Sequence, residues 1–250
     1  TPIPRTLSLT AYADLDISQI SELPFAKPTV KTWIVPESKR PDAYHWIDKK
    51  IKEEKSQAFI VCPLIEPSEK ESMKDIKAVT QEFNYLKQVF SKLKLALLHG
   101  RLKSEEKNKI INDFAHGQTQ ILVTTPVIEV GIDIPRAAIM VIEAAQRFGL
   151  AQLHQLRGRI GRRGQAGYCL LFGKTDNQRL KALTTITDGV KLAELDLKWR
   201  GPGEAWGLAQ HGFLKLKLAD PTDLKLITLT REAAAGIINS CLHHQSERFH

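Results

Sequence analysis

The sequence predicts an α/β fold in which a mostly parallel sheet is flanked by helices and followed by a helical hairpin and loop. Two observations carry this prediction. Short β-branched and apolar runs alternate with longer segments of helical periodicity, as in a βαβ succession. In addition, the runs FIVCPL from Phe59 and ILVT from Ile121 are apolar on both faces, as strands buried between two helix layers must be.

Six strands and four helices follow from these patterns in chain order. The expected strands are Thr32–Val35, Gln57–Pro63, Leu95–His99, Gln120–Thr124, Ile139–Glu143 and Gly167–Phe172. The expected helices are Pro41–Glu54, Ser72–Ser91, Ser104–Ala115 and Leu150–Leu156. After Phe172 the alternation stops, and residues 176–200 are expected to form two short helices broken near Asp188. Residues 222–242 are expected to form one more helix.

Local signals mark several helix ends. Pro41 and Asp42 suit the first turn of a helix. Ser104 is expected to cap the next start, with Glu105 and Glu106 placing negative charge at the positive helix end. Gly117 is well placed to end that helix before the strand that follows.

Composition excludes several protein classes. The chain has 250 residues, of which 42% are hydrophobic and 26% charged, which is ordinary for a globular protein and unlike disordered or collagenous chains. Cys62, Cys169 and Cys241 are odd in number and outside any C-x-x-C pair, which favours a reducing compartment and no structural zinc. The longest apolar stretch, Ala137–Ile142, indicates neither membrane insertion nor secretion.

The net charge of +8 suggests a polyanionic partner, although a solvated basic surface would give the same sum. Its position is more informative, because the segment from Arg147 to Lys181 carries a net charge of +7. The cations of this segment are Arg147, Arg157, Arg159, Arg162, Arg163, Lys174, Arg179 and Lys181, against Asp176 alone.

Two features imitate a nucleotide site. Gly173-Lys174-Thr175 ends like a phosphate-binding loop, but the glycine required five positions earlier is Tyr168, and the intervening residues form a strand. Glu143 ends an apolar strand as a magnesium-binding acid would, but without a phosphate loop an ordinary strand terminus is the better interpretation. We therefore expect no autonomous triphosphate site.

The informative constellation is TTPVIEVGIDIP, Thr124–Pro135, followed by QLRGRIGR, Gln155–Arg162. We expect the polar groups of both motifs to emerge at one edge of the sheet. Gly158 and Gly161 would let the backbone turn and pack closely, while Arg159 and Arg162, on one helical face, would point together at an anion. Guanidinium groups suit phosphate because they stay charged and bind in a fork.

These two motifs resemble motifs V and VI of superfamily 2 helicases and translocases. TPIPRTL at Thr1, CPLIE at Cys62, LLHGRL at Leu97 and QRFGLAQLHQLRGRIGR at Gln146 are similar to the RecG-type DNA helicases. The run from Thr187 to Gly212 resembles the TRG element, a helical hairpin and loop. The resemblance covers about residues 1–225 and implies a RecA-like sheet domain.

The resemblance also implies site residues. Arg162 matches the arginine finger, Arg159 the second phosphate-sensing arginine, and Gln155 the leading glutamine of motif VI. Gly131 and Asp133 match nucleotide-contacting positions of motif V. Candidates for DNA contact or coupling are Thr124, Thr125, Arg163, Lys174, Arg179, Lys181, Arg200, Gly201, Gly203 and Gln210. No metal ligand is expected.

Domain organisation follows from the same resemblance. Residues 1–25 would end the first motor domain, in motif III, and form a linker, residues 26–173 would form the second RecA-like domain, and residues 174–250 the TRG hairpin, loop and C-terminal helix. Motifs I and II are absent from the sequence, so it looks like an excised C-terminal half. ATP and Mg²⁺ would be cofactors of the intact enzyme, with the Mg²⁺ ligands outside this chain.

The implied function is that of the motor half of an ATP-dependent helicase, a hydrolase that reverses forks and migrates branched DNA junctions in repair and recombination. Expected partners are double-stranded and branched DNA, together with a wedge domain and first motor domain of the same protein. We expect a cytoplasmic, nucleoid-associated monomer that is inactive as an ATPase by itself. The alternatives are a fragment of the transcription-repair coupling translocase, or a non-catalytic nucleic-acid-binding module.

Overall fold

The computed structural model describes residues 30–63, 73–126, 134–161 and 165–189, together with scattered helical positions between 191 and 238. The described strands are β1 (Val30–Val35), β2 (Gln57–Val61), β3 (Leu95–Leu98), β4 (Ile121–Thr124), β5 (Ala137–Ile142) and β6 (Gly167–Phe172). The α-helices are α2 (Arg40–Glu54), α3 (Met73–Val89), α4 (Ser104–Ala115), α5 (Leu150–Arg157) and α6 (Gln178–Thr185). Two short 3₁₀ helices are η1 (Glu37–Lys39) and η3 (Ala145–Arg147).

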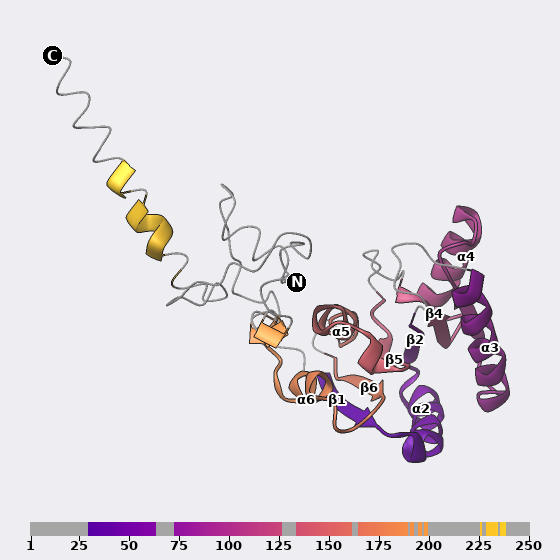
Figure 1. Cartoon of the computed structure of the whole chain (residues 1–250). Coiled ribbons are helices and arrows are strands. Elements are labelled where there is room, and N and C mark those ends of the chain that lie inside the picture. The colour runs from indigo at the N-terminus through magenta and orange to yellow at the C-terminus, as the bar shows by residue number, and fades with distance from the viewer. Residues whose placement is uncertain are drawn as a thin grey trace. The chain divides into compact units, whose positions relative to one another are not determined.

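The described strands form one parallel sheet in the order β1-β6-β5-β2-β4-β3 (Figure 1). All six expected strands and all four expected helices are present, and the predicted α/β fold class is confirmed. The fully buried strands β2, β4 and β5 are the continuous apolar runs of the sequence. The alternating strand β1, in contrast, lies at an edge of the sheet.

Helices cover both faces of the sheet because alternate strand residues are buried on opposite sides. Ala58 and Ile60 belong to a core cluster with Ile47 of α2 and Leu86 of α3. Phe59, between them in β2, instead packs its ring against Phe114 of α4, with centroids 5.1 Å apart. The result is an α/β/α sandwich.

The helix ends follow the expected signals, with one correction. Pro41 and Asp42 lie in the first turn of α2, and Gly117 follows α4 with a φ of +78°. Lys103, and not Ser104, is the N-cap of α4, where its backbone N–H donates to Glu106 Oε2 at 3.1 Å. The acidic residue three positions into the helix therefore satisfies a backbone donor at the helix start, in place of the serine cap that we expected.

The described residues up to Asp188 belong to one compact unit and those from Gly189 onward to another. Residues 226, 229–234 and 236–238, in the second unit, are helical as expected. The predicted domain boundaries at 25 and 173 stay a prediction. In the described part of the chain, no helix is long and apolar enough to cross a membrane.

Candidate functional site

Thr124 and Thr125 lie where β4 ends, at the carboxyl edge of the sheet. Both side chains are completely buried. The Thr124 hydroxyl donates to the backbone carbonyl of Thr125 at 2.8 Å, whereas Thr125 Oγ1 has no hydrogen-bond partner among the described residues. The Thr124 hydroxyl therefore helps to fix the backbone at this point, while the described residues offer the Thr125 hydroxyl no hydrogen-bond partner.

Helix α5 carries the second motif and ends earlier than expected for a pair of arginines on one helical face. Gln155 is half-buried within α5, but the helix ends at Arg157 and Gly158 caps it. Arg159 lies in the turn beyond, where its backbone N–H donates to the Leu156 carbonyl. The helical-face prediction for Arg159 is thus wrong, because α5 ends two residues before it.

The turn after α5 returns the chain to the amino edge of the sheet. Gly161 has a φ of +68°, and a Cβ there would lie 3.0 Å from the Val30 side chain and 3.4 Å from Gly167 Cα. Val30 and Gly167 are the first residues of β1 and β6. Arg159 therefore belongs to the edge opposite Thr124 and Thr125, and the prediction of a single edge for both motifs is wrong.

Arg157 is a functional candidate that the sequence analysis missed. Its side chain is buried at 6% exposure, and burial lowers its pKa. Nη1 donates to the carbonyls of Leu183 at 2.7 Å and Ile186 at 3.0 Å, and Nη2 to that of Thr187 at 3.3 Å. The guanidinium thus binds the C-terminal end of α6, where helix carbonyls lack intrahelical partners.

A signal for this role was present in the sequence. Arg157 lies four residues after Leu153 and seven after Leu150, and both of these leucines are completely buried. That spacing places Arg157 on the buried face of α5. An arginine on a buried helix face must find hydrogen-bond acceptors inside the protein.

His154 is a further hydrogen-bond partner of the Arg157 guanidinium. Its Nδ1 lies 3.0 Å from Arg157 Nη2. Burial, and secondly the neighbouring guanidinium charge, lower the pKa of His154 to about 4. The imidazole is therefore neutral near pH 7, and its Nδ1 accepts a hydrogen bond from Arg157 Nη2.

The basic candidates after β6 lie in α6 and in the loop that precedes it. Lys174 is exposed in the loop that follows β6, Arg179 is half-buried in α6 and Lys181 is exposed. Asn177 caps α6 by accepting from the backbone N–H groups of Arg179 and Leu180 at 3.0 and 3.2 Å. A cavity of about 520 Å³ lies beside the loop, lined by Pro36, Glu37, Gln146, Gly173, Lys174, Thr175 and Asp176.

The two imitations of a nucleotide site have structural roles. The Gly173 N–H donates to the Val35 carbonyl at 3.2 Å, which continues the β1–β6 ladder instead of wrapping a phosphate. Glu143 is buried and pairs with Arg40, whose Nη2 lies 2.5 Å from Glu143 Oε2. Burial raises the pKa of Glu143 to about 7 despite this pairing. Among the described residues, no group of three or more His, Cys, Asp or Glu side chains could hold a metal ion.

Several predicted positions lie outside the described residues. These are Thr1–Arg5, Gly131, Asp133, Arg162, Arg163, Arg200, Gly201, Gly203 and Gln210. Their roles stay predictions, as do those of Arg159, Gln155 and the cations around α6.

Comparisons with known proteins identify the family. Residues 42–164, which include Thr124 and Arg159, match the helicase conserved C-terminal domain. The chain is 49% identical over 238 residues to the ATP-dependent DNA helicase RecG of Thermotoga maritima. The chain belongs to the RecG-type helicase family. The alignment with that RecG covers 93% of this chain and 30% of the relative.

Other RecG proteins agree. RecG of Escherichia coli K12 is 44% identical over 225 residues, which cover 88% of this chain and 32% of the relative. A solved structure of RecG bound to a three-way DNA junction superimposes with a TM-score of 0.68 at 46% identity, covering 91% of this chain and 29% of that chain. The chain thus spans about a third of the length of the RecG proteins that it matches. The family resemblance inferred from motifs V and VI is confirmed.

Proposed function

We propose that this chain supplies the second motor domain of a RecG-type ATP-dependent helicase that translocates on double-stranded DNA and remodels branched DNA. The observation that carries the proposal is the identity of 49% to a RecG helicase over nearly the whole chain. The matched RecG structure is bound to a three-way DNA junction, which supports branched DNA as the substrate.

In this proposal Arg159 and Arg162 act on the phosphates of ATP held by another part of the enzyme. Phosphoryl transfer depends on positioning and on neutralising charge that develops on the phosphate oxygens. The turn that carries Arg159 is anchored on both sides, by α5 before it and by the close contact of Gly161 with Val30 and Gly167 after it. An arginine on such a rigid turn can be presented to a phosphate with little reorganisation. Gln155, one helical turn earlier, would support nucleotide contact together with Gly131 and Asp133.

Magnesium does not fit the described residues. Glu143, the acid at a strand end, is buried against Arg40, and the described residues contain no cluster of metal-ligating side chains. Mg²⁺ that accompanies ATP is therefore expected to be held elsewhere in the enzyme.

DNA contact would fall to the opposite edge and to α6. Lys174 and Lys181 are exposed, and cations of this kind give affinity for DNA phosphates without sequence preference. Arg163, Arg179, Thr124, Thr125 and the loop residues Arg200, Gly201, Gly203 and Gln210 complete the proposed DNA and coupling set.

Arg157 offers a physical link between the proposed ATP contact and the proposed DNA contact. It connects α5, which leads into the Arg159 turn, with the carbonyls of Leu183, Ile186 and Thr187. These residues lie at the start of the segment predicted as the TRG hairpin. A shift of the Arg159 turn on ATP hydrolysis would therefore be passed to that segment through a buried, charge-assisted contact.

The test uses the full-length protein with the substitution Arg159→Ala. We expect DNA-stimulated ATP hydrolysis to fall by at least about a hundredfold, because the charge on the transferring phosphoryl group loses a partner, while ATP binding changes little. Lys181→Ala serves as the control, since it removes a cation from α6 and should weaken DNA binding without lowering hydrolysis at saturating DNA. Unchanged turnover in Arg159→Ala would remove this residue from the ATP site.

A further inference from the structure

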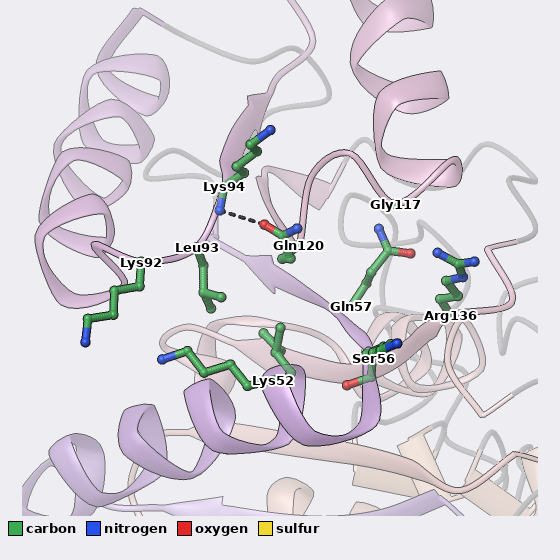
Figure 2. A pocket seen from close by; sticks show the side chains of 11 residues that line it. Lys52, Ser56, Gln57, Lys92, Leu93, Lys94, Gly117, Gln120 and Arg136 are labelled. Carbon is green, nitrogen blue, oxygen red and sulfur yellow. Dashed lines mark hydrogen bonds between the residues drawn. The ribbon is translucent and has the colours of Figure 1, made fainter.

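A basic cavity lies at the amino edge of the sheet, the edge that also carries the Arg159 turn, but its lining contains no residue of either proposed site. Its volume is about 440 Å³, within the usual range of small-molecule sites. It is lined where β2, β3, β4 and β5 begin and where α2 ends (Figure 2). In sheet order, β2 is two positions from β6, so the cavity lies on the order of 10 Å from the turn that carries Arg159.

The lining is cationic and contains no carboxylate. Its five cations are Lys52, Lys55, Lys92, Lys94 and Arg136. Lys52 pairs with Asp48 at 2.5 Å, whereas the remaining four form no ion pair with any described residue. Ile51 and Leu93 are the apolar members of the lining, which does not suit a hydrophobic ligand.

Helix ends explain part of this charge but not all of it. Helices α2, α3 and α4 end beside the cavity, and each C-terminus contributes about −0.5 of an elementary charge. Even with the Asp48 carboxylate included, a positive excess of about 2.5 charges is left for an anion. The cavity therefore has more unpaired cations than are required to balance the negative helix ends.

The floor of the cavity is rigid, whereas long lysine side chains form its rim. The Gln57 side chain donates from Nε2 to the carbonyls of Phe114 and Thr119, both at 2.6 Å. The Lys94 N–H donates to Gln120 Oε1 at 2.7 Å, as the dashed line in Figure 2 marks. Gly117 lies against Arg136, because a Cβ at 117 would come 2.7 Å from Arg136 Nη1. A fixed floor with a forked guanidinium and adjustable ammonium groups suits an anion that carries several charges on few atoms.

We infer that this cavity is a binding site for clustered phosphate groups, such as the oligophosphate of a nucleotide or adjacent phosphates of a nucleic acid backbone. These two sources share one chemistry and differ in size and shape. The site is separate from the one proposed for ATP hydrolysis and needs neither Arg159 nor Arg162.

The test measures binding of inorganic tripolyphosphate to the 250-residue chain by isothermal titration calorimetry in magnesium-free buffer. The double variant Lys94→Gln/Arg136→Gln should bind at least tenfold more weakly than the wild type. The charge-matched control is Lys31→Gln/Lys109→Gln, which changes exposed lysines outside the cavity and should stay within twofold of the wild type. The substituted positions of both variants are exposed, and thermal melting checks that each variant folds.

A second titration with a short DNA duplex, followed by fluorescence anisotropy, separates the two sources. If the cavity variant loses duplex affinity tenfold and the control does not, the phosphates belong to nucleic acid. If the variant loses only tripolyphosphate affinity, the ligand is a small anion. Absence of tripolyphosphate binding, or equal losses in both double variants, would each overturn the inference.

Discussion

At the scale of single residues, Arg157 shows how a buried charged side chain can hold two helices together. It is buried without a carboxylate, and its hydrogen bonds go to three backbone carbonyls and to His154. Such a group holds chain geometry and not substrate, so its loss should be visible in stability before it is visible in chemistry.

We predict that Arg157→Met lowers the free energy of unfolding by about 2–4 kcal/mol, because carbonyls at the end of α6 lose their donor. Urea denaturation of the 250-residue chain measures this. Lys181→Met, at an exposed position of α6, should change stability by less than about 0.5 kcal/mol. Equal effects of the two substitutions would contradict the role given to Arg157.

Glu143 is expected to make the stability of the protein depend on pH. Its pKa is raised to about 7 by burial from an ordinary value of 4.5. Between these pH values the folded protein keeps a proton that the unfolded chain releases, so this group's contribution to stability falls as pH rises.

We therefore predict that the unfolding free energy of the wild type, relative to Glu143→Gln, falls by on the order of 3 kcal/mol between about pH 4.5 and pH 7.5. Denaturation at both pH values tests this.

His154 is expected to change stability with pH in the opposite direction, because its pKa is lowered to about 4 and the unfolded chain binds a proton that the folded state does not. Relative to His154→Gln, the wild type should gain stability as pH rises from about 4 to 6.5, and a flat difference for either residue would contradict the assignment.

At the scale of elements, the two glycines of the turn after α5 differ in whether the backbone conformation requires glycine. Gly158 has a helical φ of −68°, and a Cβ there would meet only carbonyl oxygens at ordinary contact distances of 3.4 and 3.5 Å. Gly161 has a φ of +68° and is packed against Val30 and Gly167. Only Gly161 therefore needs to be glycine for conformational reasons.

We predict that Gly161→Ala destabilises the protein by about 1–3 kcal/mol, whereas Gly158→Ala is close to neutral. Thermal unfolding of the two variants side by side makes the comparison. In the full-length enzyme Gly161→Ala should also lower ATP hydrolysis, since the strain falls two residues from Arg159. A larger loss from Gly158→Ala would contradict this view of the turn.

The elements themselves could be predicted from the sequence, whereas the edge of the sheet at which the second motif lies was predicted wrongly. Continuous apolar runs specify β2, β4 and β5, and periodicity specifies α3 and α4 within two residues at each end. Both motifs follow such elements, which suggested a common edge. The motif after β4 starts at the carboxyl edge, but α5 runs back across the sheet before its glycines turn the chain, so Arg159 lies at the amino edge. Buried partnerships such as Arg40 with Glu143 join residues 103 positions apart, a separation that no local pattern encodes.

At the scale of the whole molecule, this chain contains the arginines proposed to act on ATP but no phosphate-binding loop in its sequence. We predict that the purified 250-residue chain shows no DNA-stimulated ATP hydrolysis in a phosphate-release assay. The full-length protein, assayed in parallel, serves as the positive control. A robust rate from the chain by itself would show that it carries a complete nucleotide site.

The contact of Gly161 with Val30 also brings together two distant parts of the sequence. Strand β1 begins at Val30 beside this turn, and the end of α6 is bound by Arg157 near the end of α5. The start of β1, the end of α6 and the Arg159 turn thus share one edge of the sheet, whereas Thr124 lies about 13 Å further along the strand direction. Substitutions at the start of β1 are therefore expected to disturb the Arg159 turn, although more than a hundred residues separate the two in the sequence.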